Sequence, residues 1–209
     1  MSDLLTLTQW LSPAYPVGAF TYSHGLETAI AEGDITDAET ARNWIADCLR
    51  HGAARNDAIL LTHAYAADDP TDIADLARAL ATSRERLMET EDQGRAFART
   101  TAAVWGLTLP TMPYPVAVGR AAGLKNLPLN DTLTLYLHAF TANLVSAGVR
   151  LVPLGQTEGQ AITHALQPII ADIATEAETA SLDDIGACAI RSDLSSMKHE
   201  TQTTRLFKS

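Results

Sequence analysis

The chain has 209 residues, of which 46% are apolar and 19% are charged, and its formal net charge is -10. This size and composition predict one globular domain with a full hydrophobic core. So acidic a chain lacks the basic stripe that binds a phosphate backbone, which excludes nucleic acid as its main partner.

The first predicted elements are a short amphipathic helix over residues 3–11 and a loop over residues 12–27, which reads SPAYPVGAFTYSHGLE. Pro13 and Pro16 restrict their own backbone and that of the residues before them, so we expect the loop to be rigid. Ser23 stands where an N-cap would begin the next helix. Four side chains should then gather near this helix entrance and form a surface suited to recognition: Tyr15, Phe20, Tyr22 and His24.

Four further helical segments are predicted before residue 106. Gly33 ends the helix that follows the loop, and Asp37 with Thr40 begins a core helix. Residues 55–67 form another helix, which an Asp-Asp-Pro sequence ends. Residues 72–105 consist almost entirely of helix formers, and opposite charges four residues apart on their polar face indicate a solvated helix without a chemical role.

The second half of the chain is predicted to continue a helical bundle. The proline-rich residues 106–115 form a long connection inside one domain, and a short helix follows over residues 116–124. An apolar stripe over residues 129–145 marks a central core helix, and a turn over residues 152–160 leads into another helix. No run alternates with the period of two that a strand requires, so we predict an all-α, single-domain bundle of roughly eight to ten helices with a C-terminal tail.

The tail differs in charge from the chain before it. Four basic residues against two acidic ones give it a net charge of +2: Arg191, Lys198, Arg205 and Lys208 against Asp193 and Glu200. Its apolar residues are too sparse to offset the entropy cost of ordering alone. We therefore divide the chain into a helical domain over residues 1–190 and a partner-binding tail over residues 191–209 that is flexible when unbound.

Motifs for common enzyme chemistry are missing from the sequence. The chain contains no Walker-type phosphate loop, no GxGxxG after a strand and no GxSxG elbow, so we expect no unaided nucleotide hydrolysis. Cys48 and His51 have the spacing of a metal pair, but two ligands do not make a site, and a core cysteine is favoured. His24 and Glu27 could pair as a base and its orienter, but without a nucleophile a surface hydrogen-bonded pair is favoured.

The sequence also predicts a compartment. Two cysteines far apart, without a CxxC pair, indicate a reducing environment, and no basic targeting region precedes the first helix. The most apolar segment, residues 133–154, contains His138, Asn143 and Arg150, which favours a core helix over a membrane span. We therefore expect a cytoplasmic protein that does not bind a membrane.

Three separate stretches carry a family resemblance. They are residues 12–27, residues 147–160 with the sequence AGVRLVPLGQTEGQ, and residues 196–209 with the sequence SMKHETQTTRLFKS. In this order they resemble the urease accessory protein F (UreF) family over the whole chain. The tail is the most specific stretch, because the family typically ends in HETQ followed by RLFRS. Here Lys208 replaces the usual arginine, and Thr203 stands where an aromatic residue is common.

The resemblance implies an all-helical, dimeric and non-enzymatic chaperone. Such a protein bridges the urease accessory protein D (H in some systems) and the GTPase accessory protein G, can modulate that GTPase, and serves nickel insertion into apo-urease. It holds no tightly bound cofactor, and the assembled complex handles nickel. The D/H partner captures and orders the tail before the G protein joins.

The resemblance also implies where the partners bind. Glu27 and Arg150 would lie in the region that engages the G protein, and Arg205 would support the same assembly. The expected partner-binding residues are Tyr15, Tyr22, His24, Glu27, Arg150, Lys198, His199, Glu200, Arg205, Leu206 and Phe207. No catalytic residue and no metal ligand is expected.

Three other interpretations of the sequence stay open. They are a small helical enzyme that uses His24 and Glu27, a metal-binding sensor built on Cys48 and His51, and a generic helical adaptor unrelated to urease. Turnover by the isolated chain would favour the first, and tight stoichiometric nickel binding would favour the second. Failure to restore urease activation in cells that lack the F protein would favour the third.

Overall fold

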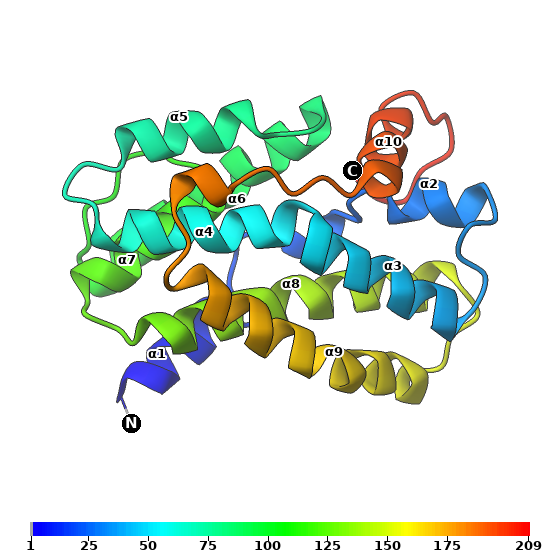
Figure 1. The fold of residues 1–209 in the computed structure, drawn as a ribbon, viewed down its shortest axis with the longest axis horizontal. Coiled ribbons are helices and arrows are strands. Elements are labelled where there is room, and N and C mark those ends of the chain that lie inside the picture. Colours follow the sequence, from blue (N-terminus) through cyan, green and yellow to red (C-terminus); the bar gives the residue numbers. More distant parts are fainter. Residues whose placement is uncertain (1) are drawn as a thin grey trace.

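All regular structure is helical in the computed structural model, which describes residues 2–209 and places no strand among them (Figure 1). The elements are α1 (Ser2–Trp10), η1 (Ala19–Thr21), α2 (Leu26–Ala31), α3 (Ala38–His51), α4 (Ala53–Ala66), α5 (Thr71–Ala79), α6 (Arg84–Trp105), α7 (Tyr114–Leu124), α8 (Leu129–Leu151), α9 (Gln156–Ala177), η2 (Leu182–Asp184) and α10 (Ile190–His199). The all-α prediction is confirmed. Met1, the first residue of the expected domain, lies outside the described residues.

The ends of two helices follow directly from local chemistry. Asp37 and Thr40 form a capping box at the start of α3, in which the Asp37 carboxylate accepts from the Thr40 amide at 2.8 Å and the Thr40 hydroxyl accepts from the Asp37 amide at 3.1 Å. The long helix α6 ends at Gly106, whose φ of 70° is left-handed. The predicted start of α3 is therefore confirmed.

The prediction of one helical run over residues 72–105 is wrong. The run divides into α5 and α6, because the chain turns at residues 80–83. At the end of this turn, the Ser83 hydroxyl accepts a hydrogen bond from the Arg86 amide at 3.1 Å and so caps a new helix. The turn contains neither proline nor glycine, so the sequence offered no strong signal for the break.

The core lies where α4 and α7 pack closely together at the centre of the bundle. A Cβ atom at Gly119 or Gly123 of α7 would collide with the backbone of Leu61 or Tyr65 in α4. Glycine at these two positions, one helical turn apart, therefore lets the two backbones approach. The helices α8 and α9 run in opposite directions beside this pair, and α3 packs across both (Figure 1). No helix within residues 2–209 is long and apolar enough to cross a membrane.

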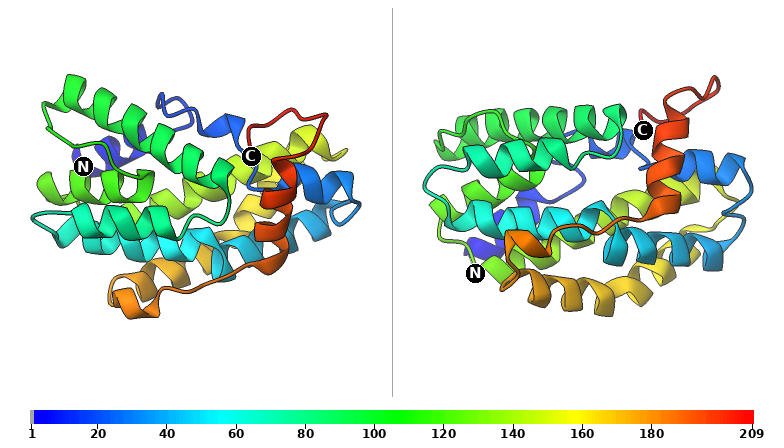
Figure 2. Two further views of the ribbon diagram at one scale, coloured as in Figure 1. Left: turned by 90° about the horizontal axis from the view of Figure 1, so that it is seen from above. Right: turned by 45° about the horizontal axis from the view of Figure 1, so that its top comes forward.

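The last helix lies far in sequence from the elements it contacts. Residues 178–189 cross the molecule from the end of α9 to the start of α10, which packs against α2 and α6 (Figure 1). The C-terminus lies beside α10 in every view (Figure 2). The boundary expected at residue 190 coincides with the start of α10, and the mobility of the unbound tail stays a prediction.

Candidate functional site

Three distant segments meet where the C-terminal tail lies on the helical body. They are the loop before α2 with the first turn of that helix, the first turns of α6, and the chain from the end of α10 to Ser209. The side chains of Glu27, Glu85, His199 and Arg205, with the backbone amides of Leu206 and Phe207, form a connected hydrogen-bonded cluster that we call the tail latch.

Glu27 is the main acceptor of the tail latch. Its Oε1 accepts from the Leu206 amide at 2.7 Å, and its Oε2 accepts from the Phe207 amide at 2.9 Å. The Nε2 atom of His199 lies 3.2 Å from the same Oε2. Only 7% of Glu27 is exposed, so these partners replace the water that the carboxylate loses on burial.

Glu85 is the second carboxylate of the tail latch. Its Oε2 lies 2.7 Å from Nδ1 of His199, and its Oε1 accepts from Nη1 of Arg205 at 2.7 Å. Glu85 stands in the first turn of α6, where the helix dipole also favours a negative charge. The exposed fraction is 7% for Glu85 and 0% for His199, so the imidazole is enclosed between two carboxylates.

The backbone around Gly25 shapes the surface on which α10 rests. Gly25 has a φ of 76°, and a Cβ atom there would stand 2.5 Å from the Ser196 amide nitrogen. The prediction of Ser23 as an N-cap is wrong, because α2 begins at Leu26 after Gly25. Ser23 instead holds the end of the tail, since its amide donates to the Ser209 carbonyl oxygen at 2.8 Å and its hydroxyl donates to the same oxygen.

Further contacts fix the tail on both sides of the latch. The Glu200 carboxylate accepts from the Arg84 amide at 2.7 Å, at the N-terminus of α6. The guanidinium of Arg150 lies 4.6 Å from the centre of the Phe207 ring. Lys198 forms an exposed ion pair with Glu32 at 2.8 Å. The tail therefore contacts α2, α6 and α8.

The expected aromatic recognition surface is not exposed as one unit. Tyr15 is buried against the rings of Phe97 and Trp105, and its hydroxyl lies 2.9 Å from that of Thr101. Tyr22 and His24 are also buried, whereas Phe20 is 61% exposed. The sequence pattern correctly placed these residues on one loop, but it could not show that the body covers most of them.

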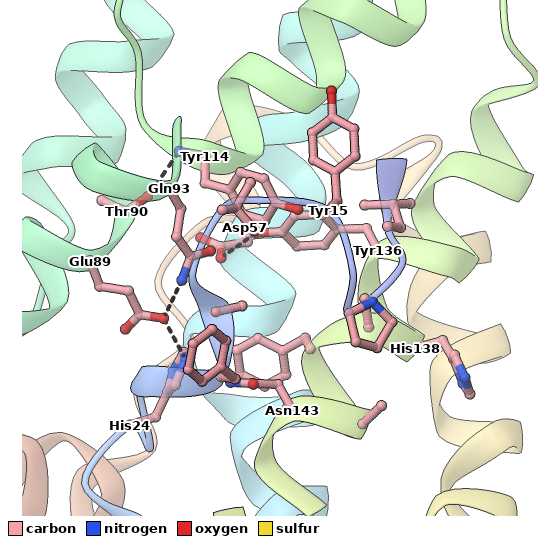
Figure 3. Close-up of a pocket in the computed structure, with 18 of the residues that line it drawn as sticks. Tyr15, His24, Asp57, Glu89, Thr90, Gln93, Tyr114, Tyr136, His138 and Asn143 are labelled. Atoms are coloured by element: carbon pink, nitrogen blue, oxygen red, sulfur yellow. Dashed lines mark hydrogen bonds and ion pairs between the residues drawn. The ribbon is translucent and has the colours of Figure 1, made fainter. Parts of the chain in front are cut away.

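A cavity of about 240 Å³ lies under this loop, with aromatic walls from the loop, α7 and α8 (Figure 3). Its polar wall includes His24, whose Nε2 lies 3.0 Å from Oε1 of Glu89. Burial and the charge of Arg86 lower the pKa of His24, so its imidazole is neutral near pH 7. Burial opposes the charge of Glu89, but Arg86 and His24 bring the pKa of this carboxyl down to about 2.

Asp57 lies on the far wall of the same cavity, where Figure 3 shows it beside Tyr136. The Tyr136 hydroxyl donates to its carboxylate at 2.9 Å. Burial nevertheless raises the pKa of Asp57 to about 6. The end of the tail adjoins this cavity, because the Ser209 hydroxyl lies 3.4 Å from Oε2 of Glu89.

The residues proposed for enzyme and metal chemistry do not come together as those hypotheses require. His24 faces Glu89 and not Glu27. Cys48 is buried, burial raises the pKa of its thiol to about 12, and its sulfur lies 3.4 Å from Oγ of Ser192, while His51 is exposed. Among residues 2–209, no group of three or more His, Cys, Asp and Glu side chains is arranged to hold a metal ion.

Sequence reasoning missed four residues of this region: Ser23 as a tail contact, Glu85, Arg86 and Glu89. The last three lie in the charged run over residues 72–105, which was interpreted as a solvated face. Arg86 and Glu89 pair with each other at the spacing of an ordinary exposed helix pair, and the contacts that bring these three residues into the site come from His24, His199 and Arg205, each more than 60 residues away. The N-cap position of Ser83 was the one available signal, since it places Glu85 in a first helical turn.

Comparison with known proteins agrees with the motif-based resemblance. The family model described as UreF matches residues 35–167. A protein from Cereibacter sphaeroides named urease accessory protein UreF is 62% identical over 205 residues, which cover 98% of each chain. Proteins of the same name from Roseobacter denitrificans and Ruegeria pomeroyi are each 52% identical, over 98% and 99% of this chain and 93% and 96% of their own lengths.

Proposed function

The chain belongs to the UreF family, and from this premise we propose that it acts in urease maturation as a non-catalytic scaffold. In this role it bridges the D/H accessory protein and the GTPase accessory protein G while nickel is inserted into apo-urease. The tail latch supports this role, because its buried carboxylates and imidazole bind another segment of the same chain. They serve to position a segment, which is the task of a scaffold.

The outer surface of α10 supports the part of the proposal that concerns the D/H protein. Ile190, Leu194 and Met197 lie at spacings of four and three residues, and each is about half exposed or more. Leu206, in the tail, is 67% exposed. Apolar side chains gathered on one helix face are typical of surfaces that a partner covers. We assign this apolar face of α10, with Leu206, to the D/H protein.

Glu27 and Arg150 have a different part in the proposal. Both hold the tail and the loop, since Glu27 binds the Leu206 and Phe207 amides and Arg150 donates to the Phe20 carbonyl oxygen at 3.0 Å. They therefore present the surface that recruits the G protein. We further propose that the protein acts as a homodimer in the cytoplasm, as the family resemblance implies.

Co-purification with the D/H and G proteins tests this function. The Leu194→Asp variant should lose the D/H protein, because a charge enters the apolar face of α10 without disturbing a buried contact. Val104→Asp, at an equally exposed site near the far end of α6, is the matched control and should keep it. Equal retention of the D/H protein by both variants, or urease activation in cells without this protein, would contradict the proposal.

A further inference from the structure

The cavity under the loop over residues 12–27 has the size and walls of a site for a small molecule. Its volume of about 240 Å³ exceeds the roughly 150 Å³ in which a protein core can hold benzene, so it has room for a ligand of about ten non-hydrogen atoms. Pro13 and Phe20 are both exposed, so the cavity reaches the surface at the loop. Five aromatic rings line it (Figure 3): Tyr15, Phe20, Tyr114, Tyr136 and Phe140.

The charged groups of this cavity are not balanced. Asp57, Glu89 and Arg86 line it, and Arg86 donates to Glu89, so the charges of that pair cancel. Within residues 2–209, Asp57 has no ion-pair partner, and its carboxylate accepts one hydrogen bond, from the Tyr136 hydroxyl at 2.9 Å. The ring of His138, at the edge of the cavity, points away from Asp57 (Figure 3). The cavity therefore carries one uncompensated negative charge when Asp57 is ionised.

An aspartate at this place costs the fold stability. Burial raises the pKa of Asp57 to about 6, although the charge of Arg86 and the Tyr136 hydrogen bond oppose the shift. An asparagine would accept the same hydrogen bond without a buried charge. The fold therefore does not require the carboxylate. A charged group that lowers stability and lines a cavity is typical of a binding residue, and a cation is the partner that it lacks.

We propose that the cavity binds a small organic cation, with a protonated amine at Asp57 and an apolar or aromatic body between the rings of the loop, α7 and α8. The faces of these rings attract an ammonium group and pack against an apolar body. An anion would be repelled by Asp57. A metal ion would need a larger set of ligands, and residues 2–209 provide no group of three or more His, Cys, Asp and Glu side chains for it. The inference concerns this chain alone and does not depend on the scaffold role.

Two ligands of the same size and shape test the proposal on the full chain at pH 7. Phenethylamine carries a positive charge, whereas 2-phenylethanol has a neutral hydroxyl in place of the amine. Calorimetric titration should show phenethylamine binding at least about tenfold more tightly, because a hydrogen bond between charged groups is the stronger one. In NMR, the ligand ring should contact the side chains of Val17 and Ala139, which line the cavity. Equal affinity for the two ligands, or contacts elsewhere on the chain, would overturn the proposal.

Two substitutions separate the cavity from the general attraction of a cation to a chain with a net charge of -10. Asp57→Asn should weaken phenethylamine binding by about tenfold or more and leave 2-phenylethanol binding unchanged. Asp131→Asn removes the same charge from an exposed position of α8 outside the cavity and should bind phenethylamine as wild type does. An Asp57→Asn chain with wild-type affinity for phenethylamine would refute the role of Asp57. If circular dichroism shows that this variant does not fold, the comparison of the two ligands on wild type still decides.

Discussion

A buried carboxylate is stable only when hydrogen-bond donors replace the water it has lost, and Glu27 shows how this chain meets that condition. Its two oxygens accept from two backbone amides and face one imidazole nitrogen, all supplied by residues 199–207. Glu27 therefore depends on the tail as much as the tail depends on Glu27. Single substitutions here should affect the order of the tail before they affect the helical body.

Glu27→Gln should weaken the docking of the tail by about 2–3 kcal/mol. The substituted amide would direct an N–H group at donors that now face an acceptor. Hydrogen exchange of the tail amides and urea unfolding would measure the effect. Glu32→Gln is the matched control, because Glu32 forms only an exposed ion pair with Lys198 and should change stability by less than about 0.5 kcal/mol. Equal effects of the two substitutions would contradict the prediction.

Asp57→Asn should increase stability at pH 7 by up to about 2 kcal/mol. Burial raises the pKa of Asp57 in the folded state to about 6, above the value of 3.8 that it has when unperturbed. Ionisation of Asp57 therefore lowers the stability of the folded wild-type chain as pH rises from about 4 to 6. The uncharged asparagine of the variant does not ionise, so the variant is spared this loss. An asparagine can still accept from the Tyr136 hydroxyl. Thermal unfolding of both chains at pH 4 and pH 7 measures the difference, which should vanish at the lower pH.

Some of these residues could be predicted from sequence and others could not. Glu27, His199, Arg205, Leu206 and Phe207 belonged to recognised motifs, and the structure brings all five together. Their roles as partner-binding residues stay predictions. Glu85 could not be found, because its charge pattern matches that of any exposed helix and its partners lie more than 110 residues away.

At the scale of elements, α2 and α10 are positioned by one close backbone approach. Gly25 lies directly against the backbone of residues 192–196, so α10 can rest on it only because no side chain intervenes. This contact accompanies the hydrogen bond between the hydroxyls of Ser83 and Ser196 at 2.8 Å, which joins α10 to the cap of α6. The fit of α10 is therefore set by small groups on both neighbours.

Gly25→Ala should weaken the docking of α10 by more than the backbone strain of an alanine with positive φ at this position. Gly18→Ala is the control, because Gly18 has nearly the same φ of 75° and nothing within 4 Å of an added Cβ. Both substitutions impose a left-handed alanine, at a cost of about 1 kcal/mol. Only Gly25→Ala adds a collision with the Ser196 backbone, so exchange protection in α10 should fall for this variant alone.

Element boundaries could be predicted where a local signal marks them. The capping box at Asp37 begins α3 as the sequence indicated, and the chain leaves α2 near Gly33 as expected. The break between α5 and α6 has only Ser83 as a signal, and helix propensity on both sides hides it. The site of Ser23 was misassigned because a hydroxyl that can cap a helix can equally bond a distant carbonyl oxygen.

At the scale of the whole molecule, the two ends of the sequence complete one structure. Deleting residues 200–209 should lower the stability of the body, because Glu85 and Glu27 would lose their tail partners. In a chain that carries Glu27→Gln and Glu85→Gln, the same deletion should lower the free energy of unfolding by about 1–3 kcal/mol less than it does in the wild-type chain. Urea unfolding of the four chains measures this coupling. A cost that is equal in both backgrounds would mean that the tail stabilises the body through its apolar contacts alone.

The connection over residues 178–189 has a practical consequence for handling the protein. It joins α9 to a helix that packs against α2 and α6, two elements from the first half of the chain. A synthetic peptide covering residues 190–209 should therefore reassociate with a chain that stops before it. Such a two-fragment version would allow a fluorescent probe to be installed in the peptide chemically, and it would turn the attachment of this segment into a titratable binding reaction.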